Sequence, residues 1–329
     1  MIIDGAAPES IAQAAAALAR GELVAFPTET VYGLGANALD DGAVAKIFEA
    51  KGRPSDHPLI VHVADADGAA AFSPGVPAFA RKLIDAFWPG PLTVIVPRRE
   101  LVAAAAAGGQ LSVGLRCPSH PVAHALLVQC AKQGVPGVAG PSANRFGRVS
   151  PTTARHVASE FGDGLLVLDG GPCDVGIEST IVDCTREGPV LLRPGMITTT
   201  QIEQACGERL RTAAELQHAA PRAPGTLESH YAPNAKVRLM GAAQLQAALD
   251  VLGHDAPRLA VYSRVILRTP SGGVIRRRMP DDAGETARQL FAVLRDFDAQ
   301  GAGLIWVEMP PDTPEWAGVR DRLRRAAAG

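Results

Sequence analysis

Two basic residues flank a glycine where a predicted helix ends. Lys51 and Arg53 stand on either side of Gly52, and a proline-bounded loop then leads into an apolar strand. An arginine can grip a phosphate with two parallel N–H groups, whereas a lysine acts as a point charge. The pattern therefore suits a polyphosphate. Basic residues also gather at helix C-termini to pair with the helix dipole, so both interpretations stay open.

Two further basic side chains belong to predicted strands. His62 lies within the apolar run 59–63, where a histidine is more often a hydrogen-bonded core residue than a catalyst. Arg116 ends the run 112–116 just before a proline-fixed turn, a place suited to clamping a carboxylate. A surface ion pair would explain Arg116 equally well.

Small hydroxyl and amide side chains gather within 140–152. Ser142 and Asn144 belong to GPSAN, and Ser150 and Thr152 follow shortly after it. Such groups suit hydrogen bonds to an amino acid or a nucleotide, although a plain turn has the same composition. The order of residues does not match a GxSxG nucleophile elbow, so no covalent nucleophile is expected.

The same theme recurs at Ser179 and Arg193, which lie at the ends of apolar runs. Open α/β sheets bind their ligands at strand ends, so these residues are candidates for the same site. No GxxxxGK[ST] loop occurs, and the glycine pair of YGLGAN lacks the third glycine of a dinucleotide fingerprint. That pair predicts only a tight turn.

The elements that must position these residues alternate along the first two-thirds of the chain. Predicted helices cover 11–18, 44–48 and 79–87, with a fourth opened by a capping box at Thr200 and Glu203. Predicted strands cover 23–26, 59–63, 92–96, 112–116, 165–168, 179–183 and 190–193.

Proline and glycine interrupt the pattern at 211–234, which predicts an interdomain linker. A smaller α/β unit with a parallel sheet follows. Its predicted strands are 236–240, 258–263 and 303–308, and its predicted helices are 242–252, 284–299 and 315–327.

Composition sets the outer limits. The 329 residues are 47% hydrophobic and 20% charged, which supports a sizeable core, and the net charge of -2 argues against stable DNA binding. The arginine run 276–278 is interpreted as a solvated face. Five dispersed cysteines form no CxxC pair, so no protein-held metal is expected. No apolar run reaches membrane-spanning length, and the protein is expected in the cytoplasm.

Taken together, these segments resemble the Sua5/YrdC/YwlC family, the threonylcarbamoyl-AMP synthases, in its longer Sua5-type form. The matching segments, in chain order, are PTETVYGLG (27–35), KGRPSDHPLIVHV (51–63), FWPGPLT (87–93), VGLRCPSH (113–120), GPSAN (140–144), SPTT (150–153), IESTIVD (177–183), LLRPG (191–195) and PGTLESHYAP (224–233).

The resemblance implies an α/β fold. It consists of a YrdC-like twisted mixed sheet flanked by helices (1–210), a linker that acts as an active-site lid (211–234), and a smaller Rossmann-like Sua5 domain (235–329). It also implies a nucleotidyltransferase that condenses L-threonine, bicarbonate and ATP to threonylcarbamoyl-AMP and pyrophosphate. The product would pass to a separate tRNA threonylcarbamoyl-transfer complex for N6-threonylcarbamoyladenosine (t6A) modification.

Residue roles follow from the resemblance at matching positions. The residues implied to hold threonine are Thr30, His62, Arg116, Ser142 and Ser179. Those implied to hold ATP, with Mg²⁺ carried on its phosphates, are Lys51, Arg53, His57, Ser112, Asn144, Ser150, Thr152, Arg193 and Tyr231. Of these, Lys51 and Arg53 are implied to be catalytic.

Two departures from the family pattern stand out. His57 replaces the usual asparagine of RPSDNPL and adds a titratable group, and the linker lacks the extra arginine and tyrosine of PGMRYRHYAP. Three alternatives stay open: an RNA-binding module for tRNA or double-stranded RNA with a YrdC-like fold, a carbamoylating enzyme with another acceptor, and a generic amino-acid adenylating enzyme.

Overall fold

The computed structural model describes residues 1–216, 219–227, 229–253 and 258–329, which form two compact units. The first contains residues 1–146 and 150–226, and the second contains 147–149 and 227–329. Within the described ranges, no helix has the length and apolar character needed to cross a membrane. All five cysteines are buried and free.

The first unit is built on an eleven-stranded sheet in the order β1-β8-β2-β3-β7-β4-β6-β5-β9-β10-β11. The strands are β1 (Ile2–Asp4), β2 (Val24–Phe26), β3 (Gly33–Asn37), β4 (Ile60–His62), β5 (Leu92–Pro97), β6 (Ser112–Arg116), β7 (Val138–Ala139), β8 (Leu166–Asp169), β9 (Thr180–Asp183), β10 (Val190–Arg193) and β11 (Arg211–Thr212).

Both parallel and antiparallel pairs occur in this sheet. For example, β4 runs parallel to β6, whereas β5 runs antiparallel to β6 and β2 antiparallel to β3. This confirms the predicted mixed α/β sheet of the first unit.

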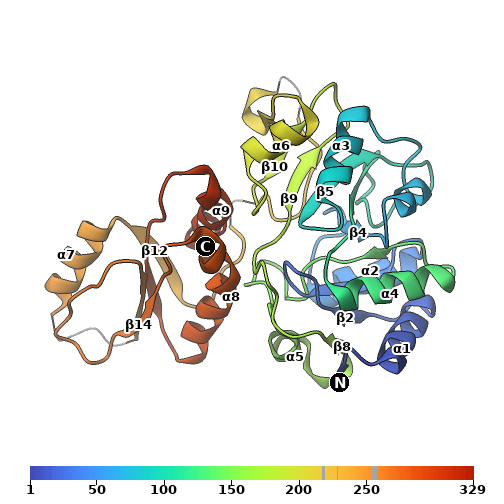
Figure 1. Cartoon of the computed structure of the whole chain (residues 1–329). Coiled ribbons are helices and arrows are strands. Elements are labelled where there is room, and N and C mark those ends of the chain that lie inside the picture. Colours follow the sequence, from blue (N-terminus) through green and yellow to red (C-terminus); the bar gives the residue numbers. More distant parts are fainter. Residues whose placement is uncertain (217–218, 228, 254–257) are drawn as a thin grey trace. The chain divides into compact units, whose positions relative to one another are not determined.

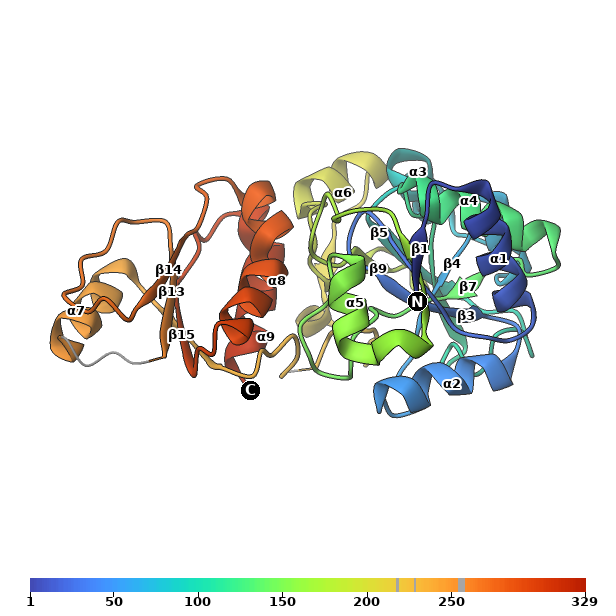
Figure 2. The same ribbon diagram turned by 90° about the horizontal axis from the view of Figure 1, so that it is seen from below.

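In the described part of the first unit, six α-helices flank the sheet. Helices α1 and α4 pack side by side, and α2 lies on the other side of the strands from them (Figures 1 and 2). The helices are α1 (Pro8–Ala19), α2 (Asp41–Lys51), α3 (Ala78–Phe87), α4 (Pro121–Lys132), α5 (Ala154–Phe161) and α6 (Thr199–Cys206).

Local signals fix the ends of α2, which carries Lys51. The Asp40 carboxylate accepts a hydrogen bond from Ala43 N at 3.0 Å and caps the start of the helix. Gly52 ends it with φ +63°, a left-handed conformation that glycine adopts without steric cost. The helix therefore stops between the two cations, as the sequence predicted.

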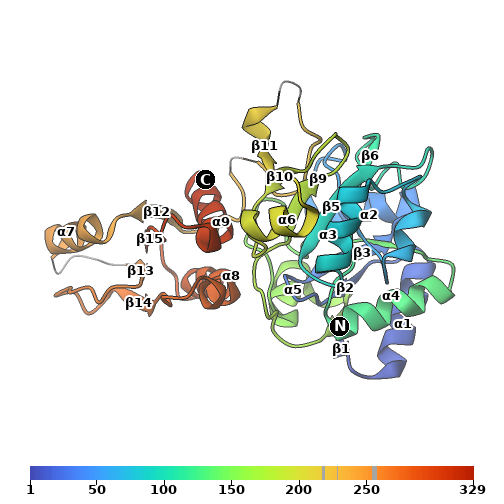
Figure 3. The ribbon, with the colours of Figure 1, turned by 45° about the horizontal axis from the view of Figure 1, so that its top comes forward.

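The second unit has a four-stranded sheet in the order β12-β15-β13-β14, and every pair in it is parallel. Helix α7 covers one face, and α8 and α9 cover the other (Figure 3). The elements are β12 (Lys236–Met240), α7 (Ala242–Leu252), β13 (Leu259–Ser263), β14 (Ile275–Arg278), α8 (Ala283–Ala299), β15 (Leu304–Glu308) and α9 (Ala317–Ala327). The predicted parallel α/β unit is confirmed.

Several local predictions were wrong. Residues 33–37 of the YGLGAN segment form strand β3 rather than a tight turn, and the strand pairs with β2. A Cβ at Gly33 or Gly35 would lie within 3.1 Å of the Phe26 ring, so the glycines leave room for that ring. The capping box of α6 uses Thr198 and Gln201, two residues before the predicted pair. Strands β1, β7, β11 and β14 and helices α4 and α5 were not predicted.

The predicted linker, 211–234, is divided between the units. Residues 211–226 belong to the first unit, and 227–234 belong to the second. Positions 217, 218 and 228 of the predicted linker lie outside the described residues. The proposed boundaries of this segment and its function as a lid stay predictions.

The close packing at Gly195, which follows β10, gives a stability test. A Cβ there would lie 2.5 Å from Thr180 N, so Gly195→Ala should destabilise the protein by about 2 kcal/mol. At Gly188 the nearest atom would be 3.9 Å away, so Gly188→Ala should change the free energy of unfolding by less than about 0.5 kcal/mol. Urea unfolding of both variants measures the difference, and equal effects would contradict it.

Candidate active site

Arg116 lies at the C-terminal end of β6 with its side chain almost fully buried. Its Nη1 donates to the Thr30 hydroxyl at 2.8 Å, and its Nε donates to the Gly90 carbonyl at 3.2 Å. Nη2 lies 2.6 Å from a carboxylate oxygen of Glu29. The structure thus brings together Thr30 and Arg116, two of the residues predicted to hold threonine.

His62 is the neighbour of Arg116 across the sheet. The two residues are register partners of the parallel pair β4 and β6, so their side chains stand on the same face. The His62 ring is buried and meets Phe26 edge-on at 5.6 Å. Burial, with a smaller contribution from the nearby Arg116 charge, lowers the pKa of His62 to about 3. The imidazole is therefore neutral at physiological pH.

One buried nitrogen of this pair has no partner. His62 Nδ1 makes no hydrogen bond among the described residues, whereas Arg116 Nη2 is paired with the Glu29 carboxylate. Buried polar atoms normally have a hydrogen-bond partner, so the unpartnered Nδ1 points to a polar ligand. A Cβ at Gly140 would lie only 3.0 Å from Nδ1, so a glycine keeps the approach to this nitrogen open.

Lys51 connects α2 to the loop after β7. Its ammonium donates to the carbonyls of Ser142 and Asn144, each at 2.5 Å. Burial, followed by the adjacent Arg53 charge, holds the pKa of Lys51 well below its ordinary value. Lys51 therefore fixes the position of the GPSAN loop.

Ser179 and Arg193 form a second group across β9 and β10. The Arg193 guanidinium donates to the Ser179 carbonyl at 2.9 and 3.1 Å and to its hydroxyl at 3.1 Å. That hydroxyl also lies 2.8 Å from the hydroxyl of Thr93 on β5. Arg193 in addition donates to the Pro224 carbonyl at 3.0 Å, which joins this group to the predicted linker.

The remaining predicted residues of the first unit are mostly buried polar groups. Ser150 donates to the carboxylate of the buried Glu178, and the amide of Thr152 donates to His156 Nδ1 at 3.2 Å. Ser112 lines a small hollow together with Thr93 and Pro224.

Arg53 and His57 both approach the ring of Phe146. Arg53 lies 5.7 Å above the ring centre and donates to the Pro58 carbonyl at 2.8 Å. His57 meets the same ring edge-on at 5.5 Å. Burial, followed by the charge of Arg53, lowers the pKa of His57, so the departure from asparagine adds a group that is neutral at physiological pH.

Tyr231 belongs to the second unit and is buried there. Its ring stacks on Phe291 of α8 at 5.5 Å, and the Arg322 guanidinium lies 5.3 Å from the ring centre. The predicted contact of Tyr231 with ATP stays a prediction.

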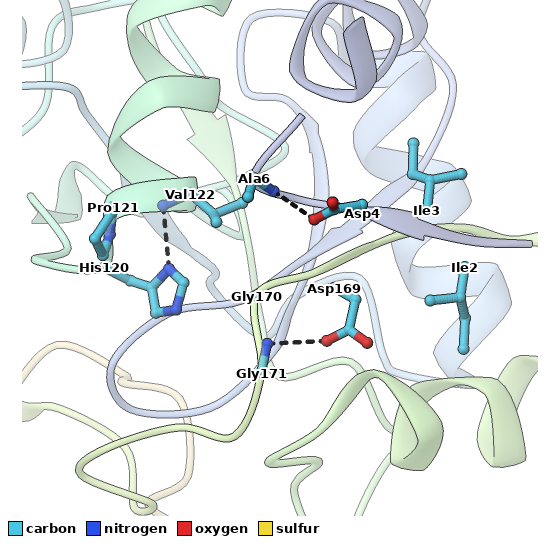
Figure 4. Close-up of a pocket in the computed structure, with 10 residues that line it drawn as sticks. All are labelled: Ile2, Ile3, Asp4, Ala6, His120, Pro121, Val122, Asp169, Gly170 and Gly171. Carbon is cyan, nitrogen blue, oxygen red and sulfur yellow. Dashed lines mark hydrogen bonds between the residues drawn. The ribbon is translucent and has the colours of Figure 1, made fainter. Parts of the chain in front are cut away.

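A separate hollow of about 680 Å³ opens beside β1 and β8 (Figure 4). It is lined by Asp4, Asp169 and His120 among others, and none of the predicted site residues lines it. His120 Nδ1 accepts from the Val122 amide at 3.2 Å, at the start of α4. This hollow is therefore distinct from the candidate site.

Sequence reasoning missed three buried polar residues that contact the predicted ones. Glu29 pairs with Arg116, Thr93 bonds to Ser179, and Glu178 bonds to Ser150. The sequence did contain an indication that Glu29 is buried, because it lies between two threonines in a segment that leads directly into a buried strand.

Basic, hydroxyl and amide side chains thus form several groups near the strand ends of an open mixed sheet, where α/β enzymes commonly bind polar ligands. A family model described as telomere recombination, for the Sua5, YciO and YrdC proteins, matches residues 16–195. A model of the threonylcarbamoyl-AMP synthase C-terminal domain matches residues 197–328.

Two curated relatives match nearly the full length. A threonylcarbamoyl-AMP synthase of Bacillus subtilis is 40% identical over 97% of this chain and 93% of its own. That of Pyrococcus abyssi is 38% identical over 95% and 93%. The crystal structure of P. abyssi Sua5 complexed with L-threonine is 37% identical, with a TM-score of 0.88, and covers 98% of this chain and 95% of its own. The chain belongs to the two-domain, Sua5-type threonylcarbamoyl-AMP synthase family.

The lowered pKa of His62 gives a pH test. In the unfolded chain His62 becomes protonated below about pH 6.5, whereas in the folded protein it stays neutral down to about pH 3. The free energy of unfolding therefore falls as the pH is lowered through this window. Between pH 7.5 and 5.0, wild type should lose about 2 kcal/mol more than His62→Gln. Denaturant unfolding at both pH values measures this loss. The same substitution at the exposed His124 is the control, and equal losses in wild type and His62→Gln would contradict the assignment.

Proposed function

We propose that the first unit condenses L-threonine, bicarbonate and ATP in a single cleft, with threonine held by Thr30, His62, Arg116, Ser142 and Ser179. The chain is a threonylcarbamoyl-AMP synthase, a nucleotidyltransferase that serves t6A modification of tRNA. The family relationship supports the reaction, and the buried polar groups support the roles of the residues.

The observation that carries the threonine assignment is the buried pair of Arg116 and His62, in which His62 Nδ1 has no hydrogen-bond partner among the described residues. Arg116 Nη2 is a cationic donor with an N–H group beyond the one that faces Glu29, which suits a carboxylate. Neutral His62 Nδ1 is an acceptor suited to an N–H or O–H group. An amino acid offers both kinds of partner within a few ångströms, so threonine could bind both nitrogens at once.

ATP is assigned to the basic residues and the neighbouring polar loops. Lys51 and Arg53 are the proposed catalytic residues, and Arg193 assists them in stabilising charge on the phosphates. The other proposed ATP contacts are His57, Ser112, Asn144, Ser150, Thr152 and Tyr231. The link from Arg193 to Pro224 supports a role for the predicted linker, 211–234, as a cover over the nucleotide.

Magnesium is proposed to arrive on ATP. In the described part of the chain, no three His, Cys, Asp or Glu side chains are grouped to hold a metal ion. The ATP phosphates and water would therefore supply most of the oxygen ligands that Mg²⁺ needs, and Lys51 and Arg53 would hold the remaining phosphate oxygens. When bound, the metal neutralises charge that develops on the departing pyrophosphate.

The proposed steps require no covalent intermediate with the protein. The threonine amine adds to bicarbonate with loss of water and gives a carbamate. A carbamate oxygen then attacks the α-phosphorus of ATP, the bond to the bridging oxygen breaks, and pyrophosphate leaves. The protein positions the partners and excludes water from a labile carbamate and mixed anhydride. The product would pass to a separate tRNA threonylcarbamoyl-transfer complex in the cytoplasm.

Pyrophosphate release tests the reaction directly. With purified full-length protein, ATP and Mg²⁺, release should require both L-threonine and bicarbonate, because the carbamate is the nucleophile. Withholding either substrate, or chelating Mg²⁺ with EDTA, should reduce the rate to background. Release that persists without bicarbonate would identify a simple amino-acid adenylating enzyme instead.

Arg116→Ala tests the carboxylate clamp. Loss of a charge-assisted hydrogen bond to the substrate should raise the threonine KM by about tenfold or more and change the ATP KM by less than about twofold. Initial rates over both substrates measure the two constants. Arg209→Ala, at a side chain 74% exposed in the first unit, is the matched control. An equal rise in both KM values would contradict the role of Arg116.

A further inference from the structure

Glu29 is a buried carboxylate on the loop between β2 and β3. The residue is only 5% exposed, and both of its carboxylate oxygens face other groups of the first unit. One oxygen accepts from the Ser119 amide at 3.1 Å, and the other lies 2.6 Å from Arg116 Nη2. The Glu29 carbonyl also accepts from the Val175 amide at 2.7 Å. Both the backbone and the side chain of Glu29 are therefore anchored.

The guanidinium of Arg116 is held at each of its three nitrogens. The Gly90 carbonyl holds Nε, the Thr30 hydroxyl holds Nη1, and Glu29 lies against Nη2. Two of these groups are neutral, so Glu29 provides the counter-charge in this set. Removing one partner of a buried ion pair leaves the other charge uncompensated, which couples Arg116 strongly to Glu29.

The contact with Glu29 differs in kind from the other two, because it joins two opposite charges, 2.6 Å apart. Nη2 carries two N–H groups, and a contact with one carboxylate oxygen needs only one of them. No other acceptor among the described residues is aligned with Nη2, so at least one N–H group is left for a second carboxylate.

We propose that Glu29 is a positioning residue, which holds the Arg116 guanidinium so that Nη2 meets the carboxylate of threonine. The proposal rests on the proposed function of Arg116. It also connects the site to the start of α4, because the Ser119 amide, which donates to Glu29, lies just before that helix. The next residue, His120, caps the helix by accepting from the Val122 amide (Figure 4). The start of α4 thus orients Glu29, and Glu29 orients Arg116.

The test is a double-mutant cycle of Glu29→Ala and Arg116→Ala in the full-length protein, with Glu29→Gln as the isosteric variant. Affinities for L-threonine and for L-threoninol, which lacks the carboxylate, are measured by calorimetry, and ATP KM by pyrophosphate release. Glu29→Ala should weaken threonine binding by about tenfold while threoninol affinity and ATP KM change by less than about twofold. In the Arg116→Ala background, the added loss should be less than about twofold.

Thermal unfolding separates positioning from folding. Glu29→Gln keeps an acceptor for the Ser119 amide, so it should fold like wild type and still weaken threonine binding more than threoninol binding. The exposed Glu9→Gln on α1 is the matched control. Equal weakening of both ligands, or additive effects of the two substitutions, would overturn the proposal. If Arg116→Ala alone left threonine affinity unchanged, the proposed function of Arg116 would fail instead.

Discussion

The candidate site depends on a single constraint: a guanidinium buried at the end of a central strand must be surrounded by matching acceptors. Arg116 is 3% exposed, and its side-chain partners come from two separate parts of the chain. Thr30 and Glu29 lie on the β2–β3 loop, and Gly90 lies in the proline-rich turn before β5. A buried charge is costly unless it is paired, so the sheet must hold these loops together in every folded molecule.

Two further basic residues hold loops of the candidate site in place. Lys51 fixes the GPSAN loop through two carbonyls, and Arg193 fixes the Ser179 segment through both its carbonyl and its hydroxyl. Each of these basic side chains thus holds a segment of the backbone in place and also brings positive charge to the site. Electrostatic preorganisation of this kind is what acyl-phosphate chemistry requires, because the protein contributes positions and charges rather than a nucleophile.

Much of the architecture could be predicted from the sequence, because apolar residues recur at clear helical or strand spacing. The limits of β6 and β10 were predicted to the residue, and α2 ends between Lys51 and Arg53 as expected. Strand β7 could not be predicted, because two residues are too few to show an alternation of apolar and polar side chains. Strand β3 could not be predicted either, because its glycines, which make room for Phe26, are more typical of a turn. Local pattern also could not pair Glu29 with Arg116, because that ion pair joins positions 87 residues apart and depends on the register of the folded sheet.

A crystal structure of the protein with L-threonine and a non-hydrolysable ATP analogue tests the central claim most directly. The threonine carboxylate should lie within about 3 Å of Arg116 Nη2, and a threonine N–H or O–H should bond to His62 Nδ1. Threonine bound elsewhere, without contact to either nitrogen, would contradict the assignment.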